Sequence, residues 1–112
     1  RGMTRGKQIQ VVLRTKVHGF LEHPEATQTL LSFATRPTDD PRAQAVDAQI
    51  FARYREESSV LFRHHPDVDA LAALLVGTVI GLVVQIRLGP AAVDPEVAID
   101  VAAQALARRA GV

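Results

Sequence analysis

Four histidines are the side chains in this sequence whose type best suits metal binding or acid–base chemistry near neutral pH. His18 and His23 are five positions apart, so they do not share a helix face as a pair at i and i+4 does. His64 and His65 are adjacent and diverge on a helix, which favours a structural role at a helix end over a shared ligand. The sequence therefore predicts no metal site and no cofactor.

Other catalytic motifs are also missing from the sequence. There is no cysteine, which removes disulfides, thiolate metal ligands and cysteine nucleophiles together. Glu56 and Glu57 are neighbours that point in different directions on a helix, and we interpret them as part of a solvated charge run. No glycine-rich phosphate loop, nucleophile elbow or HExxH motif occurs. We therefore expect a protein that is not an enzyme.

The stretch Val68–Leu88 is the most apolar part of the chain, and it predicts a helix with apolar residues all round. No charge interrupts it between Asp69 and Arg87. Gly89 can adopt a left-handed cap after it, and Pro90 prevents continuation. At about 100° per residue its two sides differ. Small residues line one side (Ala70, Ala73, Gly77 and Gly81), and bulky residues line the other (Leu75, Val79, Leu82, Val83 and Ile86).

A helix with two apolar faces needs cover on both, from lipid, from the same chain or from a second copy. Gly77-x-x-x-Gly81 is also a membrane-helix dimer motif. Against a membrane span, the uncharged stretch is shorter than the roughly 20 residues that a bilayer requires. Gln85 lies inside it, and no Trp or Tyr marks either end. We therefore expect a buried helix in a cytoplasmic homo-oligomer, with a small membrane-associated protein as an alternative.

Proline-led starts and apolar residues at helical spacing predict five main helices in all and no strands. Residues 1–7 are interpreted as a disordered or cut end, and residues 8–112 as a single helical domain. The breaks are expected near His23 and in the ranges 36–41, 64–66 and 89–94.

Two of the predicted helices carry more detailed expectations. The third is expected from about residue 42 to 63, with a buried stripe that includes Val46, Ile50 and Tyr54. The last is expected to have Asp94 as its N-cap and Pro95 at its first position. Its polar side consists of Glu96, Asp100, Gln104 and Arg108.

The aromatic residues are distributed unevenly. All five lie in the first three predicted helices, whereas the last two are built from Ala, Val, Leu, Ile and Gly. Small-residue faces suit close helix packing, and clustered rings suit a less regular interior that could hold a pocket. Rings that simply fill the core are the alternative. These residues are Phe20, Phe33, Phe51, Tyr54 and Phe62.

Several segments carry a resemblance that covers roughly residues 8 to 109. They are FLEHPEATQTLLSF (Phe20–Phe33), DPRAQAV (Asp40–Val46), and LAALLVGTVIGLVVQ followed by GPAAVDPEVAIDVAAQALARR. Together they resemble the C-terminal ligand-binding and dimerisation domain of TetR/AcrR-type transcriptional regulators. The resemblance implies that the last two helices form a four-helix dimer bundle with a second copy. Since the helix-turn-helix domain of that family is missing, DNA is expected to be contacted only through an absent N-terminal domain.

The resemblance implies a repressor domain that senses a small hydrophobic ligand. Its pocket is expected to enclose roughly a few hundred Å3, with the Tyr54 hydroxyl orienting an apolar or aromatic ligand of little charge. A helical homodimeric adaptor without a pocket is the alternative. The implied ligand-binding residues are Phe20, Leu30, Phe33, Phe51, Tyr54, Phe62, Leu75 and Val79. The implied dimer-interface residues are Ala73, Gly77, Gly81, Val84, Ala98, Ala102, Ala105 and Leu106.

Overall fold

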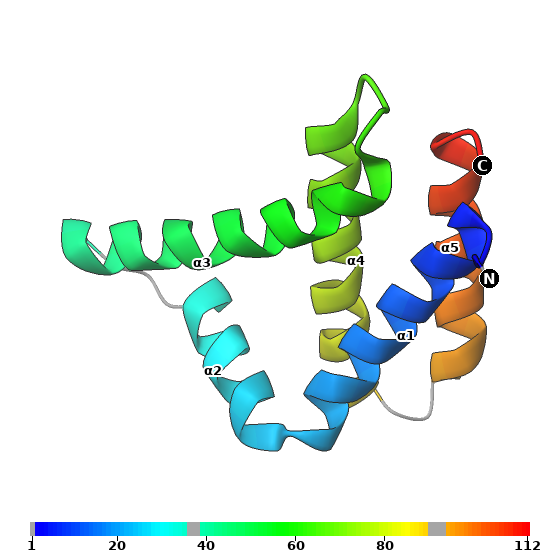
Figure 1. Cartoon of the computed structure of the whole chain (residues 1–112). Helices are drawn as coiled ribbons and strands as arrows, with labels where there is room; N and C mark the ends of the chain where they lie inside the picture. Colours follow the sequence, from blue (N-terminus) through cyan, green and yellow to red (C-terminus); the bar gives the residue numbers. More distant parts are fainter. Residues whose placement is uncertain (1, 36–38, 90–93) are drawn as a thin grey trace.

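The computed structural model describes residues 2–35, 39–89 and 94–112, and the side chains of residues 33–35 are outside this description. Within these ranges the chain is all-α, as predicted, with five α-helices, one short 3-10 helix and no strand. Helix α1 packs against α4 and α5, and α3 packs against α4 (Figure 1). The elements are α1 (Arg5–Glu22), α2 (Pro24–Thr35), α3 (Pro41–Ser59), η1 (Val60–Phe62), α4 (Val68–Leu88) and α5 (Pro95–Arg109).

The core lies where α1, α4 and α5 meet. On α1, Ile9, Leu13 and Val17 recur every four positions, so they share one face, and all three are fully buried. The bulky side of α4 packs against them, as its pattern predicted, while Ala73 and Gly77 on its small side are exposed. The core cluster is completed by Phe62, Leu71, Leu75, Val79, Val83, Ile99, Ala103 and Leu106.

Side-chain caps determine where two of the helices begin. The Thr4 hydroxyl accepts the backbone N–H of Lys7 at 3.2 Å, and α1 therefore begins at residue 5, three positions before the expected start. Asp94 accepts the N–H groups of Glu96 and Val97, and it caps α5 as predicted.

Gly89 ends α4 in a conformation that differs from the expected left-handed cap. Its φ is −137° and its ψ is 61°, and its N–H donates to the carbonyl of Gln85 at 2.8 Å. The next residue is Pro90. Because the ring of a proline clashes with helical geometry at the preceding residue, that residue is driven towards extended backbone. This restriction prevents the helix from continuing through Gly89.

Helix α3 departs most from its predicted form. The α-helix ends at residue 59, and the single turn η1 follows where a continuous helix to residue 63 was expected. Its C-terminal half packs on α4, whereas its N-terminal half projects away from the other helices (Figure 1). Val46 was expected in the buried stripe but is 50% exposed on this projecting part. The radius of gyration is 14.7 Å, compared with about 13 Å for a compact domain of this length.

Helix α4 is long and apolar enough to cross a membrane by length and composition, and in the described part of the chain it is alone in this. The whole helix has 21 residues, whereas the sequence expectation concerned its shorter uncharged stretch between Asp69 and Arg87. The core helix of a protein outside the membrane meets the same criteria, and here one side of α4 lies in the core.

Candidate functional site

A cavity lies between α1, α3 and α4, in the part of the molecule where the aromatic residues predicted a pocket. Its volume is about 50 Å3, well below the few hundred Å3 expected. The lining is largely apolar, with a lysine, a tyrosine and a serine among the polar groups. The lining residues are Lys16, Phe20, Tyr54, Ser58, Leu75, Val76, Val79 and Ile80.

The structure brings together four of the eight predicted ligand-binding residues at this cavity: Phe20, Tyr54, Leu75 and Val79. Phe51 does not line it, but its ring packs edge-on against Tyr54 with a centroid distance of 6.3 Å. Two other predicted members lie elsewhere. Phe62 is buried in the main core, Leu30 is buried on α2, and the Phe33 side chain is outside the described residues. Among the described side chains the aromatic rings therefore do not all converge on the cavity.

Two polar residues at the cavity were missed in the sequence. Ser58 follows Tyr54 by four positions on α3, and Lys16 precedes Phe20 by four on α1, so each lies on the cavity face of its helix. That spacing was the available signal. The Lys16 ammonium lies 3.5 Å from a carboxylate oxygen of Glu57, and this pair links α1 to α3.

The second candidate site consists of exposed apolar side chains on α4 and α5. Leu74 on α4 is 53% exposed, and Val97 and Val101 on α5 are 58% and 62% exposed. None of the three was predicted at the interface, although the spacing of Val97 and Val101 by one helical turn was visible. We call these three exposed side chains, Leu74, Val97 and Val101, the outer face of α4 and α5.

The predicted interface residues divide into three groups in the single chain. Ala73, Gly77 and Ala105 are exposed, and Gly81, Val84, Ala98 and Ala102 are half-buried. Leu106 is buried in the core of its own chain, because it shares a helix face with Ile99 and Ala103. Leu106 is therefore not available to a partner on the outer face.

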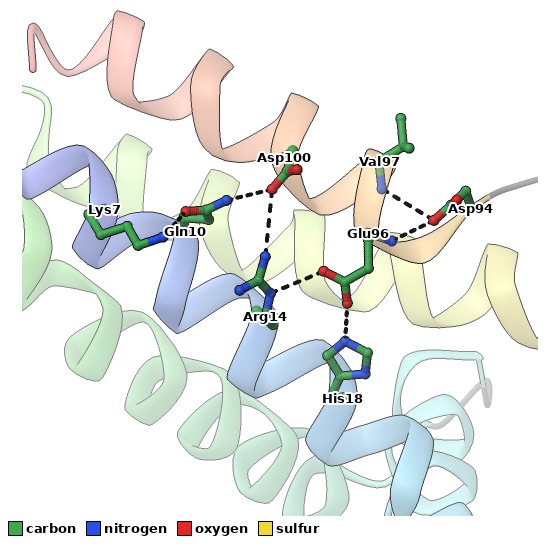
Figure 2. A network of polar contacts seen from close by, with 8 residues as sticks. All are labelled: Lys7, Gln10, Arg14, His18, Asp94, Glu96, Val97 and Asp100. Carbon is green, nitrogen blue, oxygen red and sulfur yellow. Dashed lines mark hydrogen bonds and ion pairs between the residues drawn. The ribbon is translucent and has the colours of Figure 1, made fainter.

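Two residues of the predicted polar side of α5, Glu96 and Asp100, contact α1. Figure 2 shows Arg14 of α1 reaching Glu96 at 3.1 Å and Asp100 at 3.8 Å, and His18 reaching Glu96 at 2.6 Å. Gln10 also donates to Asp100. These side chains are between a third and a half exposed, so the ion pairs add little net stability but orient α5 against α1.

Two of the histidines make structural contacts. His18 belongs to the α1–α5 network, and His65 Nδ1 accepts the backbone N–H of Asp67 at 2.9 Å in the turn before α4. Among the described residues no three His, Asp or Glu side chains are grouped so that they could hold a metal ion.

Comparison with known proteins identifies the family of this arrangement. Residues 8–111 match the family model of the C-terminal domain of BetI-type transcriptional repressors, within the TetR group. The family is regulatory and not enzymatic. No curated protein and no solved structure matches the chain. Because the match spans nearly all 112 residues, the chain belongs to the family of C-terminal domains of BetI-type, TetR-class transcriptional repressors.

Proposed function

We propose that this chain is the effector-binding and dimerisation domain of a cytoplasmic TetR-like repressor. Two copies associate through α4 and α5 in a four-helix bundle, and a small apolar ligand binds in the cavity between α1, α3 and α4. DNA is bound by an N-terminal domain outside residues 1–112. The observation that carries the proposal is the exposed apolar side chains of the outer face on α4 and α5, in a chain that matches the family model over residues 8–111.

The exposed area of the chain supports a partner. The single chain exposes 7213 Å2, whereas a monomer of this mass exposes about 6,000 Å2. The surplus of about 1,200 Å2 is comparable to the area that one subunit buries in a stable dimer. Since Leu74, Val97 and Val101 are each more than half exposed, the outer face offers apolar surface for such burial.

Two glycines on α4 support the same interface. A Cβ atom added at Gly77 or Gly81 would meet nothing within 4 Å in the protomer. A glycine inside a helix costs about 1 kcal/mol relative to alanine. Both positions are therefore open on the protomer, which leaves room for the close approach of a second helix backbone.

Substitution at Gly77 tests this interface. Gly77→Leu should weaken dimerisation roughly tenfold or more, because overpacking a close contact costs about 1–3 kcal/mol. Gly19→Leu is the matched control: this glycine lies inside α1, and a Cβ there also meets nothing within 4 Å. Sedimentation velocity over a concentration series should find an unchanged dimer for Gly19→Leu. Equal dimerisation of both variants would place Gly77 outside the interface.

The apolar lining of the cavity supports the sensing role. Phe20, Leu75, Val76, Val79 and Ile80 supply most of its wall, and sites for small molecules are typically apolar with a few polar groups. A ligand that binds only the folded state stabilises it by about 2.7 kcal/mol at a concentration of 100 times Kd.

A thermal-shift screen tests the sensing role. Small apolar compounds should raise the melting temperature by roughly 10 °C at saturation, from that stabilisation and the usual entropy of unfolding. Tyr54→Ala should abolish the shift because it removes a wall of the cavity, and Phe51→Ala should reduce it by releasing the Tyr54 ring. Val46→Ala, on the projecting part of α3, should retain it.

If no apolar compound shifts the melt, the sensing role is wrong. The small volume of the cavity, about 50 Å3, favours the second candidate in that case, a homodimeric helical adaptor without a ligand. The adaptor keeps the outer face and its two-fold interface, so only the ligand experiments separate the two functions.

A further inference from the structure

We propose that a pocket between the start of α1, the turn after η1 and the end of α5 binds a small phosphate monoester. We call it the basic pocket. Its volume is about 260 Å3, and it is separate from the cavity between α1, α3 and α4. The proposal therefore does not depend on the sensing role of that cavity. The residues of its wall that can carry positive charge are Arg5, Arg63, His64 and His65.

The ionisable side chains of the basic pocket all have the same sign. No acidic side chain is among the wall residues that the structure describes. The nearest acid along the chain is Asp67, which lines a different depression and lies 3.2 Å from the Arg109 guanidinium. Arg63 and His64, in contrast, make no hydrogen bond or ion pair with any described residue. Their donor groups are therefore available to an anion that enters the pocket.

Arg5 is held at the wall by the residues of η1. Its Nη1 donates to the carbonyl of Leu61 at 2.7 Å and lies 3.5 Å from the carbonyl of Val60. A guanidinium presents its N–H groups in a rigid planar fork. The two contacts use Nη1, so the donors on the other two nitrogens remain for a ligand. Because such a fork matches the oxygens of a phosphate, arginine suits this ligand well.

His65 supplies a donor whose place in the ring is defined. Its Nδ1 accepts the backbone N–H of Asp67 at 2.9 Å. An accepting Nδ1 assigns the proton of the neutral ring to Nε2. The wall thus combines two guanidinium groups with imidazole donors and has no carboxylate side chain among its described residues. A phosphate monoester complements this set, because it carries close to two negative charges near neutral pH and its oxygens accept strongly.

The volume and the rest of the wall limit what carries the phosphate. Leu61, Pro66 and Ala110 add apolar surface to the basic side chains. A cavity of about 150 Å3 in another protein holds benzene. The basic pocket, at about 260 Å3, therefore has room for a phosphate together with a group of about that size. Because Arg5 and Arg63 are exposed, the interaction should be sensitive to salt.

Amide NMR titrations of the whole chain with phenyl phosphate, inorganic phosphate and phenol test the proposal. Phenyl phosphate should shift the signals of residues 61–65 and bind at least about tenfold more tightly than phenol, since hydrogen bonds to charged groups are the stronger ones. Inorganic phosphate should shift the same signals and bind more weakly, because it lacks the ring. Raising NaCl to about 0.5 M should weaken phenyl phosphate severalfold.

A pair of arginine variants makes the test specific. Arg63→Gln should weaken phenyl phosphate roughly tenfold. Its side chain is exposed and makes no contact of these kinds with a described residue, so the variant is expected to remain folded. Arg53→Gln is the matched control, since Arg53 is equally exposed and without such a contact among the described residues, but lies on α3 outside the pocket. It should leave the affinity unchanged.

Three outcomes would overturn the proposal. The first is equal affinity for phenol and phenyl phosphate, and the second is an equal effect of Arg63→Gln and Arg53→Gln, which would indicate unspecific attraction of anions. The third concerns the source of the phosphate, because the backbone of a nucleic acid carries the same group. If a short DNA duplex shifts the signals of residues 61–65 and phenyl phosphate does not, the small monoester is wrong.

Discussion

Replacing Leu13 with alanine should lower the free energy of unfolding by about 2–5 kcal/mol. Leu13 is fully buried on α1, where α4 and α5 meet, and the shortened side chain leaves a cavity that three helices cannot easily close. Because domains of this size have a total stability of about 5–15 kcal/mol, the variant should lose a large part of it. Urea unfolding monitored by circular dichroism at one fixed protein concentration measures the change.

The control for Leu13→Ala is Val46→Ala. Val46 is an apolar helix residue of comparable kind, but it lies half exposed on the projecting part of α3. Its truncation should change the free energy of unfolding by less than about 0.5 kcal/mol. If the two variants were equally stable, the core would not lie between α1, α4 and α5.

Replacing Val101 with aspartate should convert the proposed dimer into a monomer at micromolar concentration. Val101 is 62% exposed in the single chain and lies on the outer face. In a two-fold dimer the change enters the interface twice, and each unpaired charge that is buried there costs several kcal/mol. The dissociation constant should therefore rise by roughly 100-fold or more. Light scattering on a size-exclusion column measures the mass directly.

Val46→Asp is the matched control for this second experiment. It introduces the same charge at another exposed helix valine, on α3 instead of the outer face. This variant should remain a dimer. If Val46→Asp dissociates and Val101→Asp remains a dimer, the interface lies on α3. If the unmodified chain is a monomer, the proposed dimer is excluded.

Local chemistry explains how much of the fold could be predicted. Pro24 begins α2, and Asp94 with Pro95 begins α5, because caps and fixed φ angles act within a few residues. The two sides of α4 could also be read directly, since helical periodicity alone separates Leu75 from Gly77. The family resemblance also rested on short segments of sequence, and the family match over residues 8–111 confirmed it.

Helix rotation and helix position could not be predicted in this way. The sequence predicts an interface on the α5 stripe that contains Ala98, Ala102, Ala105 and Leu106. In the structure α5 packs against α1, so Leu106 lies in the core while Val97 and Val101 are exposed. The polar links from Arg14 and His18 to α5 contribute to that orientation. Periodicity shows that a helix has an apolar face, but it does not show which neighbour covers that face.

The cavity depends on tertiary structure for the same reason. The sequence by itself determined that the rings lie in the first three predicted helices, and therefore where a pocket could form. Only the packing of α1, α3 and α4 decided that Phe62 fills the core, that Phe51 supports Tyr54, and that Ser58 faces the remaining space. The volume of a cavity is a small difference between large packed volumes, so it follows from the relative placement of helices and not from the residue types along them.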